Sequence, residues 1–345
     1  MQKVTSAPLA VTCGEPAGIG FDITIAAWAQ RDTLDLPPFA LFGDADAITE
    51  RASLLGSALP VQRIDTLAAV STYFHQALPV VHIPQSKPTR AGQPDTANGA
   101  AVIAAIDAAT AQVMSGQACA LVTNPIAKNV LYAAGFSHPG HTEYLAVLAT
   151  RHRPGYQFTP VMMLACDELR VAPLTIHVPL ASVAGLITRK MIAETTHIVH
   201  AALIQDFGIT NPRIAIAGLN PHAGESGTIG REDEEIVRPA VEALRQAGLS
   251  VTGPHSADTL FHAAARETYD AVIAMYHDQA LIPIKTLAFD RGVNMTLGLP
   301  FVRTSPDHGT AFDIAGSGRA RPDSLIEALR LAQRAAERRG AALPS

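Results

Sequence analysis

The feature that most constrains the fold of this chain is a series of short apolar runs, each as long as a single β-strand, separated by segments of helix length. The runs are LAVT (9–12), FALFG (39–43), VVHI (80–83), CALVT (119–123), PVMMLA (160–165), LTIHV (174–178), RIAIAGL (213–219), AVIAM (271–275) and VNMTL (293–297). Alternation of strand-length and helix-length segments predicts an α/β fold with a largely parallel or mixed sheet flanked by helices.

The segments between these runs carry helical periodicity. Apolar residues recur with a helical repeat in 102–113 and 237–244, and Gly248 is placed to end the second helix. The segment 181–206 is long and amphipathic, and 323–338 predicts a surface helix rich in Ala, Arg and Glu. With 345 residues, of which 48% are hydrophobic, the chain is long for one core, so we expect two interwoven lobes.

Charge and cysteine content exclude several classes of function. The net charge is -5 and no basic tract is present, which argues against nucleic acid and anionic membranes as partners. We find no secretory signal and no run of the ~18 apolar residues that a membrane span needs. The three cysteines form no CxxC pair, which excludes a cysteine zinc site and suggests a reducing, cytoplasmic location.

Three histidines are associated with the ends of predicted strands: His177 in LTIHV, His222 after RIAIAGL and His277 after AVIAM. Carboxyl ends of parallel strands open into a ligand crevice. Three imidazoles with an open position suit a catalytic divalent metal such as zinc, cobalt or manganese. A single histidine in an apolar run is more often a core residue, so the prediction depends on the set of three.

Two further segments suit an anion or a cofactor. His141 and Thr142 precede a predicted helix, where exposed amides favour an anion, although Thr142 could also be a simple N-cap. Lys285, Asn294 and Arg303 surround a predicted strand and suit a phosphate or carboxylate.

The glycine-rich loop TCGEPAGIG follows the first strand but matches neither a P-loop nor a complete GxGxxG motif. Alone it favours a packed turn between a strand and a helix.

The segment DHGTAFDIAGSGRARPDSL (307–325) resembles a loop of the isocitrate and isopropylmalate dehydrogenases that holds the adenosine half of the nicotinamide cofactor. The resemblance implies a cofactor site of a different type from the Rossmann fold, in keeping with the missing GxGxxG. It places His308, Gly309, Thr310 and Asp313 at the cofactor, which would be NAD or NADP.

Motifs along nearly the whole chain extend this resemblance. They are GEPAGIG, LVTNPIAK, HPGHTEYLA, MMLACDELRV, GLNPHAGESGTIGRED, AMYHDQALIPIK and GVNMTLGLPFVRTSPDHGTAFDIAGSG. With them the chain resembles the 4-hydroxythreonine-4-phosphate dehydrogenase family of pyridoxal phosphate biosynthesis. The resemblance implies a two-lobed isocitrate/isopropylmalate dehydrogenase-like fold with a cleft between the lobes. We expect a cofactor-side lobe of 1–135 plus 305–345, a central lobe of 136–304, and a homodimer whose active site is completed across the interface.

The resemblance also implies the roles of individual residues. One divalent metal per subunit (zinc, cobalt, magnesium or manganese) would be bound by His177, His222 and His277, and substrate by His141, Thr142, Lys285, Asn294 and Arg303. Asp258 matches an acidic residue beside the metal. The expected reaction is oxidation of 4-phosphohydroxy-L-threonine followed by decarboxylation. Asp258, Lys285 and a metal-bound water are all candidates for the general base.

Other functions compete with this one. A paralogue could oxidise D-threonate or D-erythronate 4-phosphate, or a dihydrodiol dicarboxylate, with the same metal and cofactor. A metal-dependent hydrolase or lyase of a phosphorylated small molecule would need the histidines and the anion groups but no dinucleotide. A non-catalytic binding protein would retain the ligand without turnover.

Overall fold

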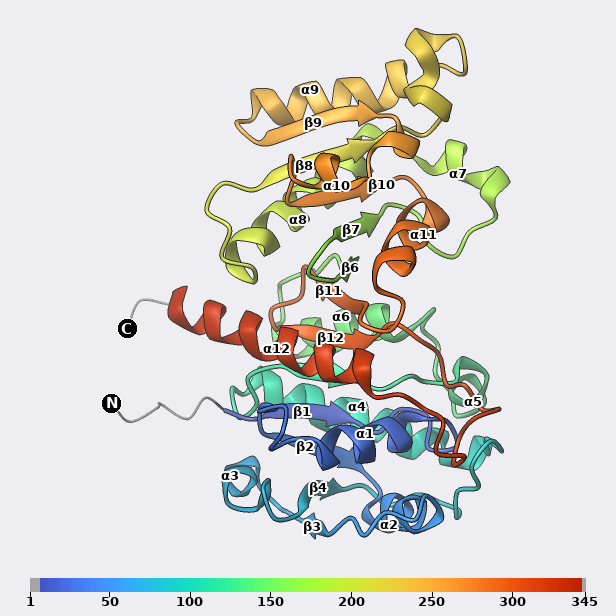
Figure 1. Cartoon of the computed structure of the whole chain (residues 1–345), viewed down its shortest axis with the longest axis vertical. Helices are drawn as coiled ribbons and strands as arrows, with labels where there is room; N and C mark the ends of the chain where they lie inside the picture. Colours follow the sequence, from blue (N-terminus) through green and yellow to red (C-terminus); the bar gives the residue numbers. More distant parts are fainter. Residues whose placement is uncertain (1–6, 343–345) are drawn as a thin grey trace. The chain divides into compact units, whose positions relative to one another are not determined.

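The computed structural model describes residues 7–342, which form two compact units. The first contains residues 7–160 and 299–341, and the second contains residues 161–298, so the chain leaves the first unit once and returns to it (Figure 1). The units divide the chain at different residues from the expected lobes, because 136–160 and 299–304 group with the first unit.

The first unit is built on an all-parallel sheet. Its strands, in spatial order, are β3 (Val61–Arg63), β4 (Leu78–His82), β2 (Phe39–Gly43), β1 (Leu9–Thr12), β5 (Leu121–Thr123) and β12 (Arg303–Pro306). β12 comes from the far end of the chain and pairs with β5. Parallel strands are buried on both faces, which explains the continuous apolar runs LAVT and FALFG.

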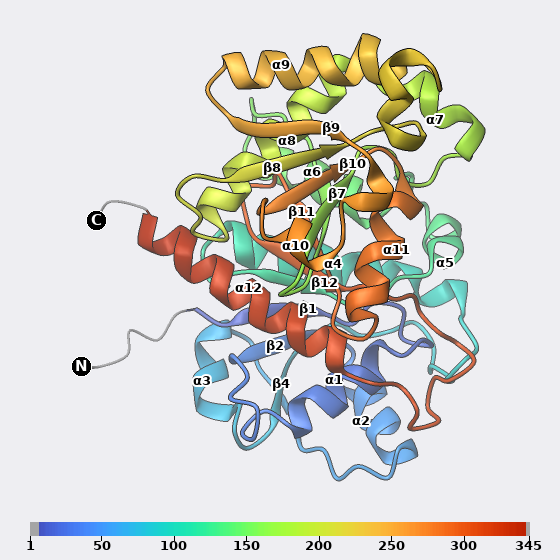
Figure 2. The ribbon, with the colours of Figure 1, turned by 45° about the horizontal axis from the view of Figure 1, so that its top comes forward.

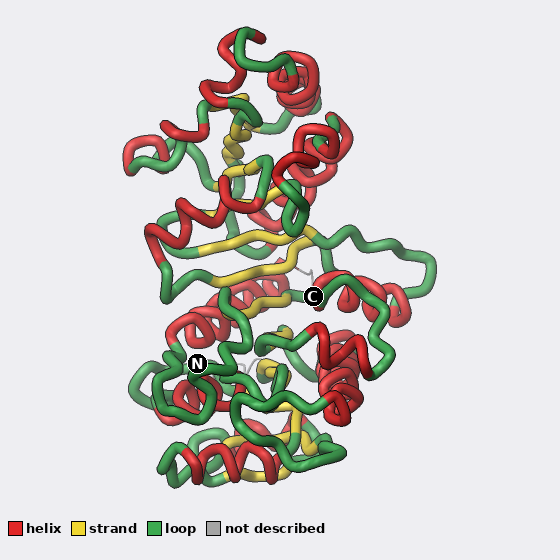
Figure 3. Tube along the Cα trace, turned by 90° about the vertical axis from the view of Figure 1, so that its right-hand side faces the viewer, coloured by secondary structure: helices red, strands yellow, loops and turns green. Residues whose placement is uncertain are grey.

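Helices cover both faces of this sheet, which Figure 3 shows edge-on. They are α1 (Gly20–Ala29), α2 (Ala45–Leu54), α3 (Val70–Tyr73), α4 (Gly99–Met114), α5 (Lys128–Ala133), α6 (His141–His152) and α12 (Asp323–Ala342). In Figure 1, α1 and α12 lie in front of β1 and α4 lies behind it. The predicted surface helix at 323–338 has one buried face, which includes Leu325, Leu329 and Ala332, so its description as a surface helix was incomplete.

One helical segment, Thr96–Met114, is long and apolar enough to cross a membrane, which the sequence analysis did not expect. Its helical part, α4, packs against β1 and β2 and buries Val102, Ile106 and Ala109. These contacts are those of a core helix in a folded unit.

The second unit has a mixed sheet. Its strands, in spatial order, are β11 (Val293–Leu297), β6 (Val161–Ala165), β7 (Arg170–Pro173), β10 (Ala271–Ala274), β8 (Arg213–Ala217) and β9 (Ser250–His255). β6 runs antiparallel to both neighbours, while β7, β10, β8 and β9 are parallel. The predicted α/β class with a mixed sheet is confirmed.

The helices of this unit are α7 (Leu180–Leu186), α8 (Arg189–Gln205), α9 (Arg238–Gln246), α10 (Ala263–Arg266) and α11 (His277–Ala288). α9 runs along the edge strand β9, and α11 lies beside β7 and β10 (Figure 2). Ala280 and Ile284 of α11 join the buried cluster that includes Leu164 and Val272. This packing fixes the first turn of α11 at the carboxyl end of β10.

One local prediction was wrong. The run 174–178 is not a strand, because the segment that pairs with β10 is the earlier Arg170–Pro173. The amphipathic segment 181–206 is divided between α7 and α8, since Thr188 begins α8 by accepting a hydrogen bond from the amide of Met191 at 3.1 Å.

Candidate functional site

The glycine-rich loop after β1 packs against the polypeptide that follows β5. A Cβ atom on Gly14 would lie 2.4 Å from the carbonyl oxygen of Pro125, and one on Gly20 would lie 2.5 Å from that of Cys13. These two glycines therefore serve the packed turn that the sequence favoured.

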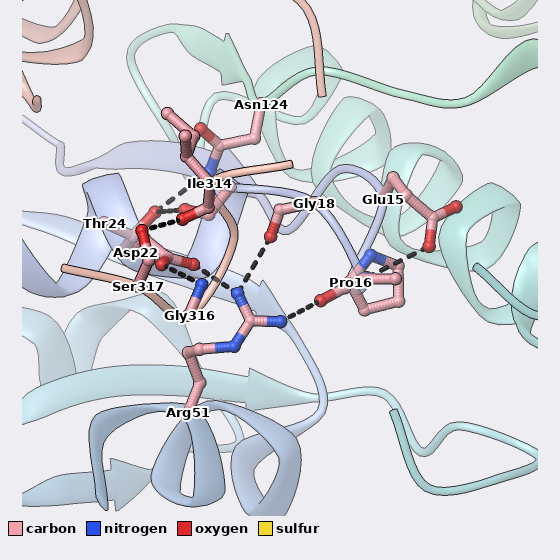
Figure 4. Close-up of polar contacts among 12 residues, drawn as sticks. Glu15, Pro16, Gly18, Asp22, Thr24, Arg51, Asn124, Ile314, Gly316 and Ser317 are labelled. Atoms are coloured by element: carbon pink, nitrogen blue, oxygen red, sulfur yellow. Dashed lines mark hydrogen bonds and ion pairs between the residues drawn. The ribbon is translucent and has the colours of Figure 1, made fainter. Parts of the chain in front are cut away.

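Gly18 has a different neighbour, the segment after β12. A Cβ atom on Gly18 would lie 2.8 Å from the carbonyl oxygen of Thr310, and the amide of Ile19 donates to the same oxygen at 3.0 Å. The structure thus brings the glycine loop against the predicted cofactor loop (Figure 4). Of the cofactor residues, His308 and Thr310 are half-buried, and Gly309 and Asp313 are exposed.

Glu15 is a buried carboxylate within the glycine loop. One oxygen accepts from the amide of Ala17 at 3.0 Å, and burial raises the pKa of the carboxyl. Within residues 7–342, its second oxygen has no hydrogen-bond partner. A buried acceptor without a donor is costly, so this atom is one that a donor group of a ligand could satisfy after a small rearrangement.

A second polar cluster of the first unit contains Arg303 and His141. Arg303 is 4% exposed, and its Nε and Nη2 donate to Oγ1 of Thr123 at 3.1 Å and 2.6 Å. Burial lowers the pKa of Arg303 to about 10, whereas the carboxylate of Glu143 acts in the opposite direction. Even so, the guanidinium is charged at neutral pH, and a buried charge of this kind attracts an anion.

His141 begins α6 with a buried Nε2. Burial, followed by the charge of Arg303, holds the pKa of His141 well below its ordinary value, so the imidazole is neutral at pH 7. The N-cap residue of α6 is Gly140, and no side chain among the described residues caps the helix. The N-cap role considered for Thr142 is therefore wrong, and the first turn of α6 keeps amides that suit an anion.

The three histidines lie in the second unit after three adjacent parallel strands. His177 follows β7, His277 follows β10 and His222 follows β8, and the sheet order is β7–β10–β8. Their carboxyl ends share one edge of the sheet. The ring centroids of His177 and His277 are 5.8 Å apart.

The backbone at His222 is unusual. Residues 222–226 all have positive φ, between 41° and 79°, and form a left-handed turn. For each residue other than glycine, this conformation costs roughly 1–2 kcal/mol relative to the right-handed one. The buried carboxylate of Asp233 anchors the entry to the turn, because it accepts from the amides of Leu219 at 2.7 Å and Asn220 at 2.9 Å. Sequence reasoning missed Asp233, whose only signal was its place in the quoted motif.

Gln279 holds two of the strand ends together. Its Oε1 accepts from the amide of Met275 at 2.6 Å, and its Nε2 donates to the carbonyl of Gly218 at 2.8 Å. Met275 follows β10 and Gly218 follows β8, so the side chain joins the segments that carry His277 and His222.

Asp258 and Lys285 belong to the same unit. A hydrogen bond from Ser256 is the main cause of the lowered pKa of Asp258, and the nearby His222 contributes. Lys285 lies on α11 two turns after His277, and both line an open groove of about 420 Å³.

Asn294, on β11, has a buried Oδ1 without a partner among the residues described.

The substrate residues are therefore divided between the units: His141, Thr142 and Arg303 in the first, Lys285 and Asn294 in the second.

A different group has potential ligand atoms within 4.8 Å of one another, namely Asp44, Asp46 and His82. The carboxylate of Asp44 accepts hydrogen bonds from the amides of Asp46, Ala47 and Gln85, and the imidazole of His82 accepts one from the amide of Ala45. These atoms serve the start of α2, so we assign no metal to them. In the described part of the chain, the three histidines do not form so close a group.

The chain is similar to known proteins over nearly its full length. The family model described as "Pyridoxal phosphate biosynthetic protein PdxA" matches residues 35–332. A 4-hydroxythreonine-4-phosphate dehydrogenase of Methylorubrum populi is 56% identical over 96% of this chain and 95% of the relative. The crystal structure of the enzyme of that name from Klebsiella pneumoniae has a TM-score of 0.84 and 37% identity, covering 96% of this chain and all of the other. A terephthalate 1,2-cis-dihydrodiol dehydrogenase from Burkholderia xenovorans has a TM-score of 0.63 and 30% identity, covering 95% and 98%.

The fold and these relatives define the chain as an α/β oxidoreductase of the dehydrogenase class. The predicted enzyme class is confirmed. More particularly, the chain belongs to the PdxA family of pyridoxal phosphate biosynthetic proteins, as the sequence motifs indicated.

Proposed function

We propose that the chain oxidises 4-phosphohydroxy-L-threonine with NAD or NADP to 2-amino-3-oxo-4-phosphooxybutanoate, which decarboxylates to 3-amino-1-hydroxyacetone 1-phosphate. The observation that carries the proposal is the set of three histidines after β7, β10 and β8. The chain that contains them is 56% identical to a relative named 4-hydroxythreonine-4-phosphate dehydrogenase. A hydrolase would share the histidines but not the dehydrogenase relatives.

The donor set of the histidines fits a divalent metal. His177 and His277 are neighbours, and His222 follows the adjacent strand. His222 also lies close enough to Asp258 to contribute to the lowered pKa of that carboxyl, after the hydrogen bond from Ser256. Imidazole ligands favour zinc or cobalt over magnesium, while manganese is compatible. When bound, the metal would polarise the substrate alcohol and stabilise negative charge on oxygen. Asp258 and Lys285 are the candidates for accepting the alcohol proton.

The anionic groups of the substrate would be held by the cationic and polar side chains that the resemblance implies. Arg303 is a buried charge with a fixed orientation, and His141 and Thr142 open α6 beside a helix N-terminus. Lys285 and Asn294 would supply the remaining contacts. Holding phosphate and carboxylate at two points would direct the carbinol hydrogen toward the nicotinamide.

The dinucleotide would bind against two loops, the glycine loop after β1 and the segment after β12, which meet at Thr310. His308, Gly309, Thr310 and Asp313 would contact it, as the resemblance implies. The close approach of Gly18 to Thr310 holds the two loops together. The unsatisfied oxygen of Glu15 supports a ligand there, because a buried acceptor without a donor is costly.

We further propose that the protein is a homodimer. The segment after His177, which includes α7, presents large apolar side chains, with Leu180 70% exposed and Val178 and Leu186 also exposed. A second copy of the chain would cover them. Light scattering coupled to gel filtration should give twice the chain mass for the wild type and the chain mass for Leu180→Glu.

The deciding experiment is NADH formation by the metal-loaded protein with three substrates in parallel: 4-phosphohydroxy-L-threonine, D-threonate 4-phosphate and the cis-dihydrodiol of terephthalate. We expect turnover of the first, abolished by chelation and restored by zinc or cobalt. Turnover of the third alone would favour the activity named for the Burkholderia relative. Turnover of the second alone would assign the chain to a sugar-acid route, and turnover of none would refute the proposed function.

A further inference from the structure

A buried ion pair lies beneath the two loops proposed to bind the dinucleotide. Arg51, on α2, is 4% exposed, and Asp22, in the first turn of α1, is 3% exposed. Nη1 of Arg51 contacts Oδ2 of Asp22 directly. Removing two charges from water is costly unless further hydrogen bonds satisfy them, so the remaining contacts of this pair are informative.

The other hydrogen bonds of Arg51 go to the glycine loop. Nη1 donates to the carbonyl of Gly18 at 2.9 Å, and Nη2 donates to the carbonyl of Pro16 at 3.0 Å. Figure 4 shows the guanidinium pointing into the loop with these two carbonyls and Asp22 around it. A planar guanidinium has a fixed arrangement of donors, so it holds both carbonyls in one geometry.

Asp22 extends the same network to the second loop. Its Oδ1 accepts from the amide of Gly316 at 2.7 Å, although 294 residues separate the two positions. The glycine loop also meets the second loop directly, through the hydrogen bond from Ile19 to Thr310. Arg51 and Asp22 are thus linked to both loops, while neither side chain is exposed enough to contact a ligand itself.

We propose that Arg51 and Asp22 are positioning residues for the dinucleotide: the pair holds the loops 13–20 and 307–318 in the relative geometry that binding requires. The inference rests on the proposed function, since it takes these loops as the NAD site. A purely structural pair would stabilise the unit without affecting one ligand more than another. The contacts favour positioning, because beyond their ion pair both side chains contact backbone groups of these loops: the carbonyls of Gly18 and Pro16 for Arg51, and the amide of Gly316 for Asp22.

The test compares Arg51→Lys with Arg330→Lys in the full-length, metal-loaded enzyme. Arg330 is a matched control, because it also pairs with a carboxylate (Glu327, 2.9 Å) and donates to a backbone carbonyl (Leu34, 3.0 Å) within the first unit. Lysine keeps the charge at position 51 but cannot reach both carbonyls and Asp22 with the same geometry. The quantities measured are Kd for NAD by calorimetry, KM for NAD, KM for substrate, kcat and Tm.

We expect Arg51→Lys to raise the Kd and KM for NAD at least tenfold and to leave the KM for substrate within twofold. Arg330→Lys should leave all of these constants within twofold. Asp22→Asn keeps an acceptor for Gly316 and loses the charge, so it should raise the Kd for NAD in the same direction. This second variant tests the inference if Arg51→Lys does not fold.

Three results would overturn the inference: an unchanged Kd for NAD in folded Arg51→Lys or Asp22→Asn, a parallel rise in both KM values, or an equal effect of Arg330→Lys. Each of these results is interpretable only when the wild-type enzyme binds NAD and turns over the substrate. A wild type that does neither would instead refute the proposed function, and the two failures are therefore distinguishable.

Discussion

The buried guanidinium of Arg303 donates two hydrogen bonds to the hydroxyl of Thr123, from Nε at 3.1 Å and from Nη2 at 2.6 Å. Thr123 ends β5 and Arg303 begins β12, and these strands are parallel neighbours. The hydroxyl therefore orients the charge that we propose for an anionic group of the substrate.

Replacing Thr123 by valine should weaken substrate use. The change removes the oxygen with little change of shape, and a hydrogen bond to a charged group contributes roughly 1.5–3 kcal/mol, so kcat/KM should fall by about tenfold to a hundredfold. Steady-state kinetics at saturating NAD measures this. Thr110→Val is the matched control: Thr110 is buried in α4 and its hydroxyl has no partner among the described residues, so activity should be retained. Equal activity of the two variants would contradict the role of Thr123.

The neutral state of His141 should make stability depend on pH. The folded-state pKa lies below the ordinary value of 6.5, so the unfolded chain binds more protons as the pH falls below 6.5. The contribution is fully present above pH 6.5 and is lost progressively below it. Tm measured between pH 8 and pH 5 should fall less steeply for His141→Gln than for the wild type. Parallel curves would show that His141 is not buried in its neutral form.

If the three histidines bind the metal, replacing one of them should reduce the amount of metal that the protein holds. Wild-type protein dialysed against zinc or cobalt should keep one ion per chain, and His222→Ala should lose it, because two imidazoles hold an ion much less well than three. Elemental analysis measures the content, and metal should raise the Tm of the wild type only. His197→Ala, an exposed histidine on α8, is the control and should keep the ion. Full retention in His222→Ala would exclude this residue as a ligand.

The left-handed turn at 222–226 predicts a stabilising substitution. Ser226 has φ 56° and is exposed, so Ser226→Gly should remove strain. The gain is partly offset by the greater freedom of glycine in the unfolded chain, leaving roughly 0.5–1 kcal/mol in the free energy of unfolding. Urea denaturation measures the difference, with Ser226→Ala as the control that retains a Cβ. A glycine variant no more stable than the alanine variant would argue against strain at this position.

The sequence by itself determined the class of fold and the chemical groups available. Runs such as LAVT and VNMTL became strands at the expected residues, and the periodicity of 102–113 became α4, because the spacing of apolar residues is a local property of the chain. The histidines could be identified as candidates for the same reason, since each follows or lies in an apolar run.

Only the tertiary structure decided which groups meet. The strand β12, with the sequence Arg-Thr-Ser-Pro, has no apolar pattern and is buried because it pairs with β5. The approach of His177 to His277 depends on the pairing of β7 with β10, and the contact between Arg51 and Asp22 joins positions 29 residues apart. Such contacts depend on sheet order and on packing between distant segments, which local propensity does not encode.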